Sequence, residues 1–313
     1  MLFAPFTPPA SGRSQLRVLA AVLCDRLDAL TRPEPSPLYE ERPANPAPAL
    51  RRLRVMTYNT HGGIGADGQC RPERIAQVIG RYSPDVVALQ EIDVGCGGSG
   101  RLDQARNIAD LTGMSAHFTG ARDKDGGRYG NAILTHHPYE LQAEGILPVR
   151  RGEVRAAQCL RLAFDHGHLD VINTHLSLHF FERLAQYRAL FSDDPRAPLG
   201  QQPAPFPALQ GALNRTILCG DFNAGALSPL YFSLRRRLTD AQRARGQRAR
   251  ATWPAHFPLL RLDHIWVGKD LHVENVIVPR DAATRAASDH LPIVVDLRID
   301  GAPMALATQG QTP

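Results

Sequence analysis

Residues 216–225 read TILCGDFNAG, an apolar β-rich run that stops at a glycine and is followed at once by Asp221 and Asn223. Similar runs elsewhere in the chain also begin or end at a polar residue. Asn59 ends LRVMTYN, Glu91 ends VVALQE, His175 ends LDVINTH, Asp263 precedes HIWV, and Asp289 with His290 precedes LPIVVDL. A polar side chain at a strand end is easily solvated and rigidly aimed. Several such ends at one edge of a sheet therefore predict a polar cleft.

Short β-rich runs alternate with helical patterns from residue 53 onward. We expect strands at residues 53–58, 86–89, 132–135, 169–173, 216–219, 265–267 and 293–299. We expect helices at residues 72–81, 104–111, 181–191 and 228–238, with Pro72 in a first helical position and Ser228 as an N-cap. This alternation predicts an α/β fold in which helices cover β-sheets.

The composition is that of a globular chain. Its 313 residues are 43% hydrophobic and 21% charged, which excludes a wholly disordered, collagen-like or coiled-coil protein. The net charge is +5, but residues 235–250 alone hold seven arginines and one aspartate, so the rest of the chain is close to neutral. For this arginine segment, contact with a nucleic-acid backbone, contact with anionic lipid headgroups and a merely solvated surface all remain open.

The first fifty residues differ in texture from the rest and contain nine of the 25 prolines. Within them, leucines at spacings of three and four predict one amphipathic helix: Leu16, Leu19, Leu23, Leu27 and Leu30. Docking on the main domain is the favoured interpretation of this helix, and anchoring at a membrane interface is the alternative. We therefore expect a proline-rich extension and linker over residues 1–50, a catalytic domain over residues 51–300 and a disordered tail over residues 301–313.

The cysteines and the apolar runs bear on the compartment. The five cysteines are scattered, odd in number and without C-x-x-C spacing, which disfavours a disulfide framework or a structural zinc site. No run of 18 apolar residues is present, and the short run at residues 18–24 lacks a convincing cleavage site. These observations predict a cytoplasmic protein.

The polar residues at the strand ends suit one kind of chemistry. They are rich in oxygen ligands and include two histidines, which favours Mg²⁺ or Mn²⁺ over zinc. A histidine beside an aspartate supplies a proton-transfer group near neutrality. Each signal is weak alone, because a lone Asp or Asn after glycine is more often a turn residue. Together they point to phosphoester hydrolysis.

Seven segments resemble those of the endonuclease/exonuclease/phosphatase superfamily. They are MTYNTHGG, ALQEID, GNAILTHHP, INTHLSLH, CGDFNAG, LDHIWV and SDHLP, and they fall within residues 53–299. The resemblance implies a four-layer sandwich of two mixed β-sheets flanked by helices. It also implies a metal-dependent phosphoric ester hydrolase whose cofactor is Mg²⁺ or Mn²⁺.

The resemblance assigns three residues to the metal: Asn59 and Glu91 would hold it, and Asp289 would assist. Two further residues would act on water and on phosphate. Asp221 would orient or deprotonate the attacking water, and Asn223 would bind a phosphate oxygen.

The two histidines would complete the chemistry. His290, steered by Asp263, would act as general base or as a stabiliser of the transition state. His175 would donate to a non-bridging oxygen or to the leaving group. By the same resemblance Glu153 would orient His175, although an ordinary Glu/Arg pair at a strand edge is an equal alternative.

Three more residues are candidates for substrate binding. Arg155 lies close enough in sequence to Glu153 to meet the phosphate beside His175. Asn131 falls where the family places an amide that supports the site. Arg128 would either contact substrate or simply close a loop.

The leading functional prediction is a nuclease-type phosphodiesterase that uses metal-assisted attack by water. One alternative is a phosphodiesterase of phospholipid headgroups or small phosphoesters. The other is a catalytically silent binding module of the same fold. The predicted partner is a phosphoester substrate, with nucleic acid favoured and an anionic lipid surface possible, and we infer no obligate protein partner.

Overall fold

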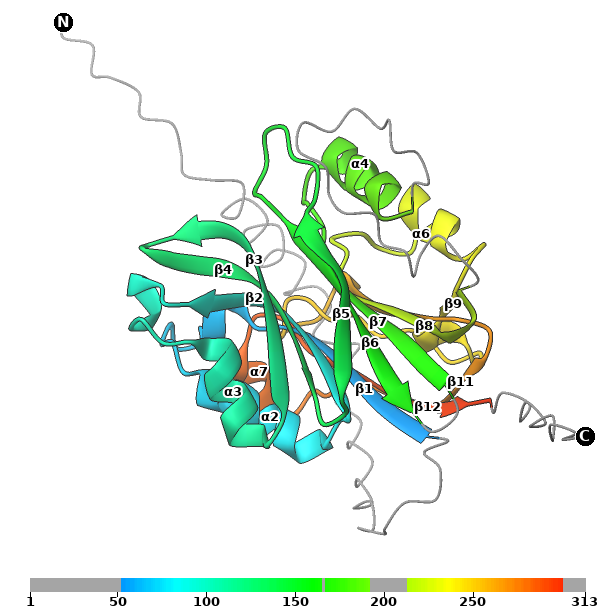
Figure 1. Cartoon of the computed structure of the whole chain (residues 1–313), viewed down its shortest axis with the longest axis horizontal. Helices are drawn as coiled ribbons and strands as arrows, with labels where there is room; N and C mark the ends of the chain where they lie inside the picture. The colour runs from blue at the N-terminus through cyan, green and yellow to red at the C-terminus, as the bar shows by residue number, and fades with distance from the viewer. Residues whose placement is uncertain (1–51, 165–166, 192–212, 301–313) are drawn as a thin grey trace, which may run out of the picture. The chain divides into compact units, whose positions relative to one another are not determined.

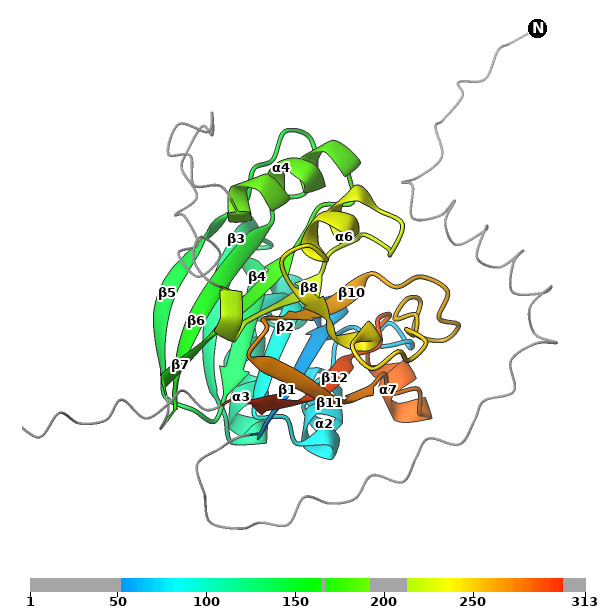
Figure 2. The same cartoon turned by 90° about the vertical axis from the view of Figure 1, so that its right-hand side faces the viewer.

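Two β-sheets of six strands each pack face to face in the computed structural model (Figures 1 and 2). The structure describes residues 52–164, 167–191 and 213–300. The predicted extension, with its amphipathic helix, and the predicted tail lie outside the described residues. The domain boundaries at residues 50 and 300 therefore stay predictions.

The first sheet has the order β11-β12-β1-β2-β4-β3. Its strands are β11 (Leu271–Ile277), β12 (Ile293–Ile299), β1 (Arg52–Asn59), β2 (Val86–Val94), β4 (Gly127–Thr135) and β3 (Ser115–Lys124). Only β1 and β2 pair in parallel, at the centre of the sheet, and their neighbours are antiparallel.

The second sheet has the order β5-β6-β7-β8-β10-β9. Its strands are β5 (Tyr139–Ile146), β6 (Ala156–Phe164), β7 (Gly167–His175), β8 (Thr216–Asp221), β10 (Asp263–Val267) and β9 (Thr239–Asp240). It too has one central parallel pair, β7 with β8, among antiparallel neighbours. Each sheet is therefore mixed, with its parallel pair in the middle.

Helices cover the outer face of each sheet, which makes four layers (Figures 1 and 2). The first sheet carries α2 (Pro72–Tyr82), α3 (Gln104–Thr112) and α7 (Ala282–Ala287), and the second carries α4 (Phe180–Phe191) and α6 (Pro229–Leu234). Short 3-10 turns lie at η1 (His61–Gly63), η2 (Gly97–Ser99), η3 (Leu213–Arg215) and η4 (Ala241–Arg243). The predicted α/β fold of two mixed sheets flanked by helices is confirmed.

Alternation along the strands builds two apolar cores. Side chains of alternate residues face opposite sides of a strand. Those facing inward from both sheets form one core, which includes Val55, Ala88, Ile217, Ile265 and Ile293. Those facing outward from the second sheet meet α4 and α6 in another, which includes Leu218, Trp266, Tyr187, Leu190 and Tyr231. The inward-facing side chains therefore line the space between the two sheets along each strand, including the strand ends.

Every predicted strand and helix has a counterpart, and the errors have physical causes. Five observed strands were not predicted: β3, β5, β9 and β11, which are the four sheet edges, and β6. Edge strands face solvent along one side and carry more polar residues, while the alanine-rich start of β6 has low strand propensity. The helix predicted at residues 228–238 ends at Leu234 instead. There the last turn tightens into bonds from Arg236 N to Ser233 O and from Arg237 N to Leu234 O, at 3.3 and 2.9 Å.

Candidate active site

The two central parallel pairs bring the polar strand ends together. Parallel strands end at the same edge of a sheet, and that edge is where α/β proteins place their ligands. Asn59 is the last residue of β1, His175 the last of β7 and Asp221 the last of β8. His175 and Asp221 are also partners in the strand register, so their side chains start from adjacent positions.

A glycine permits the close pairing of β7 and β8 beside the site. Gly220 has a φ of 138°, and a Cβ at this position would lie 1.8 Å from the carbonyl oxygen of Thr174. Any side chain would therefore push the two strands apart. The glycine before Asp221 holds this carboxylate next to His175.

Asp221 is the centre of the site and is 1% exposed. Its carboxylate accepts a hydrogen bond from Asn59 Nδ2 at 3.0 Å and from the Asn223 backbone N–H at 2.9 Å. His175 Nε2 lies 3.4 Å from Oδ2, and His290 Nε2 lies 3.8 Å from the same oxygen. Burial, and then the negative charge of Asp263, raise the pKa of Asp221 to about 7.

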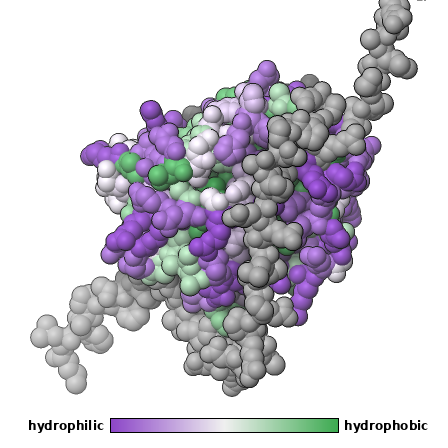
Figure 3. Space-filling model, turned by 90° about the horizontal axis from the view of Figure 1, so that it is seen from below, coloured by the Kyte–Doolittle hydropathy of each residue, from purple (hydrophilic) through white to green (hydrophobic). Residues whose placement is uncertain are grey.

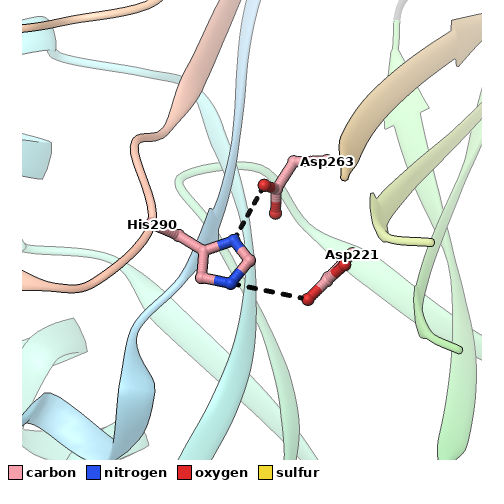
Figure 4. A group of neighbouring side chains, drawn as sticks. All are labelled: Asp221, Asp263 and His290. Atoms are coloured by element: carbon pink, nitrogen blue, oxygen red, sulfur yellow. Dashed lines mark hydrogen bonds and ion pairs between the residues drawn. The ribbon is translucent and has the colours of Figure 1, made fainter. Parts of the chain in front are cut away.

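His290 lies between two carboxylates (Figure 4). Its Nδ1 is 2.9 Å from Asp263 Oδ2, while its Nε2 faces Asp221. Asp263, at the start of β10, is the register partner of Asp221. Burial opposes a charged imidazole, yet the charge and hydrogen bond of Asp263 and the charge of Asp221 raise the pKa of His290 to about 10. The charged form of His290 is therefore favoured, with both ring nitrogens facing carboxylates.

Ser288 fixes the loop that carries His290. Its hydroxyl donates to the Asn59 carbonyl oxygen at 2.8 Å and accepts from the His290 backbone N–H at 3.2 Å. Sequence reasoning missed this residue, although it stands in the SDH segment. Its signal was its place two residues before His290, where a short hydroxyl can bond the backbone two residues on.

His175 has the opposite kind of neighbour. Arg155 Nη1 lies 3.2 Å from His175 Nδ1, and a guanidinium can only donate, so Nδ1 accepts and the ring proton is on Nε2. Nε2 in turn faces Asp221 and lies 3.3 Å from Asn223 Nδ2. The Asn223 amide is anchored by a bond from Nδ2 to the Leu176 carbonyl oxygen at 2.9 Å. The contact with Arg155 favours the neutral Nε2–H form of His175, with Nε2 directed into the site.

A chain of ion pairs holds the buried guanidinium of Arg155. Its Nη2 lies 2.9 Å from Glu153 Oε2, its Nη1 donates to Tyr129 Oη at 3.3 Å, and Glu153 Oε1 accepts from Arg122 at 2.7 Å. Glu153 is thereby linked to His175 through Arg155, the residue that sequence analysis had assigned to phosphate.

A β-bulge brings Glu91 into the site. Regular alternation would send Glu91 to the opposite face from Gln90, but the pairing of β2 with β4 shifts there and Glu91 has a φ of 61°. Its Oε1 accepts from Asn59 Nδ2 at 3.1 Å, so Asn59 joins Glu91 to Asp221. Asn59 Oδ1 accepts from the His61 backbone N–H at 3.1 Å.

Asp289 lies at the more exposed side of the site, with 43% of its side chain accessible. Its carboxylate is 3.7 Å from His61 Nδ1 and accepts from Trp253 Nε1 at 3.4 Å. His61 follows Asn59 closely, so Asp289 adjoins the Asn59 end of the site.

The donor set fits a divalent cation. Glu91 and Asp221 share one amide nitrogen, and Asp263 Oδ1 is buried without a hydrogen-bond partner among the described residues. Asp221, Asp263 and His290 also have ligand atoms within 4.8 Å of one another. In that group the two carboxylates favour the charged form of His290, and an imidazole protonated on both nitrogens would offer no lone pair to a metal. Glu91 and Asn59 are the better candidates to hold a metal.

Two predicted substrate contacts lie outside this cluster of bonds. Asn131 is buried and donates to the Ala156 carbonyl oxygen at 2.8 Å, which ties β4 of one sheet to β6 of the other. Arg128 is exposed, and its side-chain hydrogen bond reaches the Gly120 carbonyl oxygen at 3.4 Å. The structure gives Asn131 a bracing position, and it does not bring Arg128 into the cluster.

Buried amides beneath the site were missed at the sequence level. Gln90 Nε2 donates to Asn173 Oδ1 across the sheets at 2.8 Å, and Asn173 Nδ2 donates to the carbonyl oxygens of Leu89 and Ala132 at 2.8 and 2.9 Å. Both residues occupy inward positions of apolar strands. A polar residue at such a position was the available signal, since a buried amide needs a partner.

A family model matches residues 56–290, which is most of the chain, and is described as the endonuclease/exonuclease/phosphatase family. The chain belongs to this family. The family consists of metal-dependent phosphoesterases, both nucleases and phosphatases. Among the helices in the described ranges, none combines the length and apolar composition needed to cross a bilayer.

Relatives share both sequence and fold with the chain. The uncharacterized protein YbhP of Escherichia coli K12 is 27% identical over 264 residues, covering 79% of this chain and 96% of YbhP. The human Nocturnin catalytic domain with bound sulfate is 22% identical with a TM-score of 0.60, covering 80% and 95% of the two chains. A mannosyl-6-phosphatase of Bacteroides thetaiotaomicron is 21% identical with a TM-score of 0.57, covering 78% and 99%. At these identities the two structures show a shared fold.

Proposed function

We propose that the protein is a divalent-metal-dependent phosphodiester hydrolase in which water attacks phosphorus directly. One observation carries the proposal: Asp221 lies where both parallel strand pairs end, between a neutral and a cationic imidazole. Such a site offers a proton acceptor, a hydrogen-bond donor and a fixed positive charge within a few ångströms. Hydrolysis of a phosphate ester needs all three.

Glu91 and Asn59 would hold the cation, with Asp289 on its accessible side. Carboxylate and amide oxygens are the ligands of Mg²⁺ and Mn²⁺, and their excess of negative charge here calls for a cation. When bound, the ion would neutralise charge that develops on the phosphoryl group and the leaving oxygen.

Asp221 takes the proton from the attacking water. His290 is the other candidate base, but the carboxylates that face its two ring nitrogens favour its charged form, which has no free lone pair. Asp221 is buried, faces the site and has a carboxylate raised toward neutrality, which suits a general base. His290 then serves as the fixed positive charge that stabilises the transition state.

His175 and Asn223 bind the phosphate. The His175 ring and the Asn223 amide face the same space beside Asp221, with Nε2 and Nδ2 3.3 Å apart. His175 Nε2–H donates to a non-bridging oxygen or to the leaving oxygen, and Asn223 Nδ2 donates to a second oxygen. Donors fixed in advance on a developing negative charge lower the barrier more than donors that must reorganise.

The test measures hydrolysis of a chromogenic phosphodiester, with an Asp221→Ala variant as the blank. We expect activity that EDTA abolishes and that Mg²⁺ or Mn²⁺ restores. Activity that persists in excess EDTA would contradict metal dependence. The catalytically silent alternative predicts no difference between the intact protein and Asp221→Ala on any ester.

The catalytic residues do not by themselves choose between nucleic acid and phospholipid headgroups, because they all surround the phosphate. The arginine segment at residues 235–250 supports a polyanionic partner of either kind, since all seven of its arginines are exposed. A second candidate function, hydrolysis of headgroup phosphodiesters, is favoured by the exposed apolar side chains on α4, on α6 and in the loops before these helices.

A further inference from the structure

Five large apolar side chains are exposed on one helical layer of the protein. They belong to α4, to α6 and to the loops that lead into these helices, and are Leu178 (58% exposed), Phe180 (44%), Phe181 (81%), Leu227 (90%) and Phe232 (48%). Scattered exposed apolar residues are ordinary, but five on one layer, two of them almost fully exposed, mark an interaction surface.

The two helices lie side by side on the second sheet (Figures 1 and 2). Tyr187 Oη of α4 lies 2.6 Å from Ser233 Oγ of α6. The loops before the helices are joined by the bond from Asn223 Nδ2 to the Leu176 carbonyl oxygen. These same loops begin at His175 and Asn223, so Leu178 and Leu227 lie only three and four residues along the chain from the site.

The layer is also strongly cationic. Its exposed arginines are Arg150, Arg151, Arg188, Arg235, Arg236 and Arg237. Residues 147–155, 176–191 and 222–238 contain only two acidic residues, Glu153 and Glu182. Glu153 is paired with arginines, and Glu182 is buried and accepts from the backbone N–H groups of residues 150, 151 and 152 at 3.1, 2.6 and 2.8 Å. No free negative charge offsets the arginines on these described segments.

We propose that this α4–α6 surface docks on an anionic phospholipid bilayer, with its phenylalanines and leucines inserted among the headgroups and its arginines on the lipid phosphates. Apolar insertion combined with basic residues is how peripheral proteins hold to anionic membranes. Nucleic acid explains the arginines and phenylalanines by charge and stacking, but it offers nothing to Leu178 and Leu227.

The opposite end of the protein looks different. Seen from below in Figure 3, away from α4 and α6, hydrophilic side chains cover most of the described surface and hydrophobic ones are scattered. Docking through the α4–α6 surface would bring the His175 and Asn223 side of the site to the membrane. The idea that a docked protein hydrolyses a headgroup phosphodiester rests on the proposed function. The docking itself does not rest on it.

The experiment is co-sedimentation of the full-length protein with phosphatidylcholine vesicles, with and without phosphatidylserine. We expect binding that phosphatidylserine strengthens and that salt weakens. The double variant Phe181→Ser and Leu227→Ser should bind at least about tenfold more weakly, because each fully exposed apolar side chain contributes through its burial. The matched control is Leu111→Ser on α3, a residue 55% exposed on the other helical layer, which should bind as the unchanged protein does.

Several outcomes would overturn the proposal. The first is that the intact protein does not bind vesicles. The second is that the double variant binds vesicles as well as the intact protein does. The third is that the double variant keeps vesicle binding but loses single-stranded DNA binding or self-association. Hydrolysis of a soluble chromogenic diester is measured in parallel and should be equal in all variants. If that activity is absent while the double variant still loses vesicle binding, the proposed function fails and the docking surface stands.

Discussion

His175 and His290 flank the same carboxylate, yet their surroundings are opposite. His290 has a carboxylate at each ring nitrogen, whereas His175 has an arginine at Nδ1 and an amide beside Nε2. One ring is held as a cation and the other as a neutral donor. A histidine at a strand end therefore acquires its role from the group that contacts its ring, because that group fixes which ring nitrogen carries a proton.

The two sides of Asp221 also differ in origin. His290 lies in the loop that leads into β12 of the first sheet and its partner Asp263 begins β10 of the second, so this ion pair joins the sheets. On the other side, Arg155 directly precedes β6 and His175 ends the neighbouring β7, so both lie at the same end of the second sheet. The cation therefore depends on how the sheets pack, and the neutral donor on how one sheet is built.

The largest expected effect comes from replacing the cation. His290→Gln keeps a polar side chain of similar reach but removes the positive charge between Asp221 and Asp263. We expect kcat for a chromogenic diester to fall on the order of a thousandfold.

The control for this loss is His272→Gln. The half-exposed His272 lies on β11 and pairs with Asp300, far from the reaction, so its replacement should leave kcat unchanged. A His290→Gln enzyme within a few fold of the unchanged protein would show that the charge is not used in catalysis.

A smaller effect, and one that depends on the replacement, is expected on the other side. If His175 acts as a neutral donor, glutamine can supply an N–H in its place and alanine cannot. We expect His175→Ala to lower kcat about a hundredfold and His175→Gln only about tenfold. Equal losses in the two variants would mean that His175 must change its protonation during turnover, and the contrast with His290 would then be wrong.

The smallest expected effect comes from the residue behind His175. Arg155→Met removes the donor from Nδ1, which frees that nitrogen to take a proton, and we expect kcat to fall about tenfold. The direct measurement is the ¹⁵N spectrum of the His175 ring, which should show the Nε2–H form in the unchanged protein and a mixture in Arg155→Met. The conservative variant Arg155→Lys, which can donate one such bond, should retain more of the Nε2–H form. An unchanged spectrum in Arg155→Met would remove Arg155 from its positioning role.

The site was partly predictable because strand patterns are local. Asn59, His175 and Asp221 stand at the ends of apolar runs, and the register of parallel strands then placed them at one edge. Arg128 was not brought to this cluster, since nothing in the sequence says which residues of a loop or strand end point inward. Glu91 reaches Asn59 only through a bulge, which a regular alternation does not contain.

The edge strands show the same limit for the fold. The sequence did not predict the four edge strands, β3, β5, β9 and β11. An edge strand pairs along one side and faces solvent along the other, so it can carry polar residues that obscure the alternation of apolar and polar positions. The central strands, buried on both faces, gave the clear apolar runs. The fold class could therefore be predicted from the central strands, whereas the edge strands gave no clear signal.

The sequence alone predicted the α/β class and the set of polar residues at strand ends, because both depend on short-range pattern, whereas the two-sheet fold was implied by the resemblance of seven segments to a known family. Tertiary structure decided how those residues work. Asn59 meets Asp221 across 162 positions of chain, His290 lies between carboxylates of the opposite sheet, and His175 Nδ1 faces the arginine that precedes the neighbouring strand β6. Proton positions follow from the charges nearby in space, and only the folded chain brings those charges together.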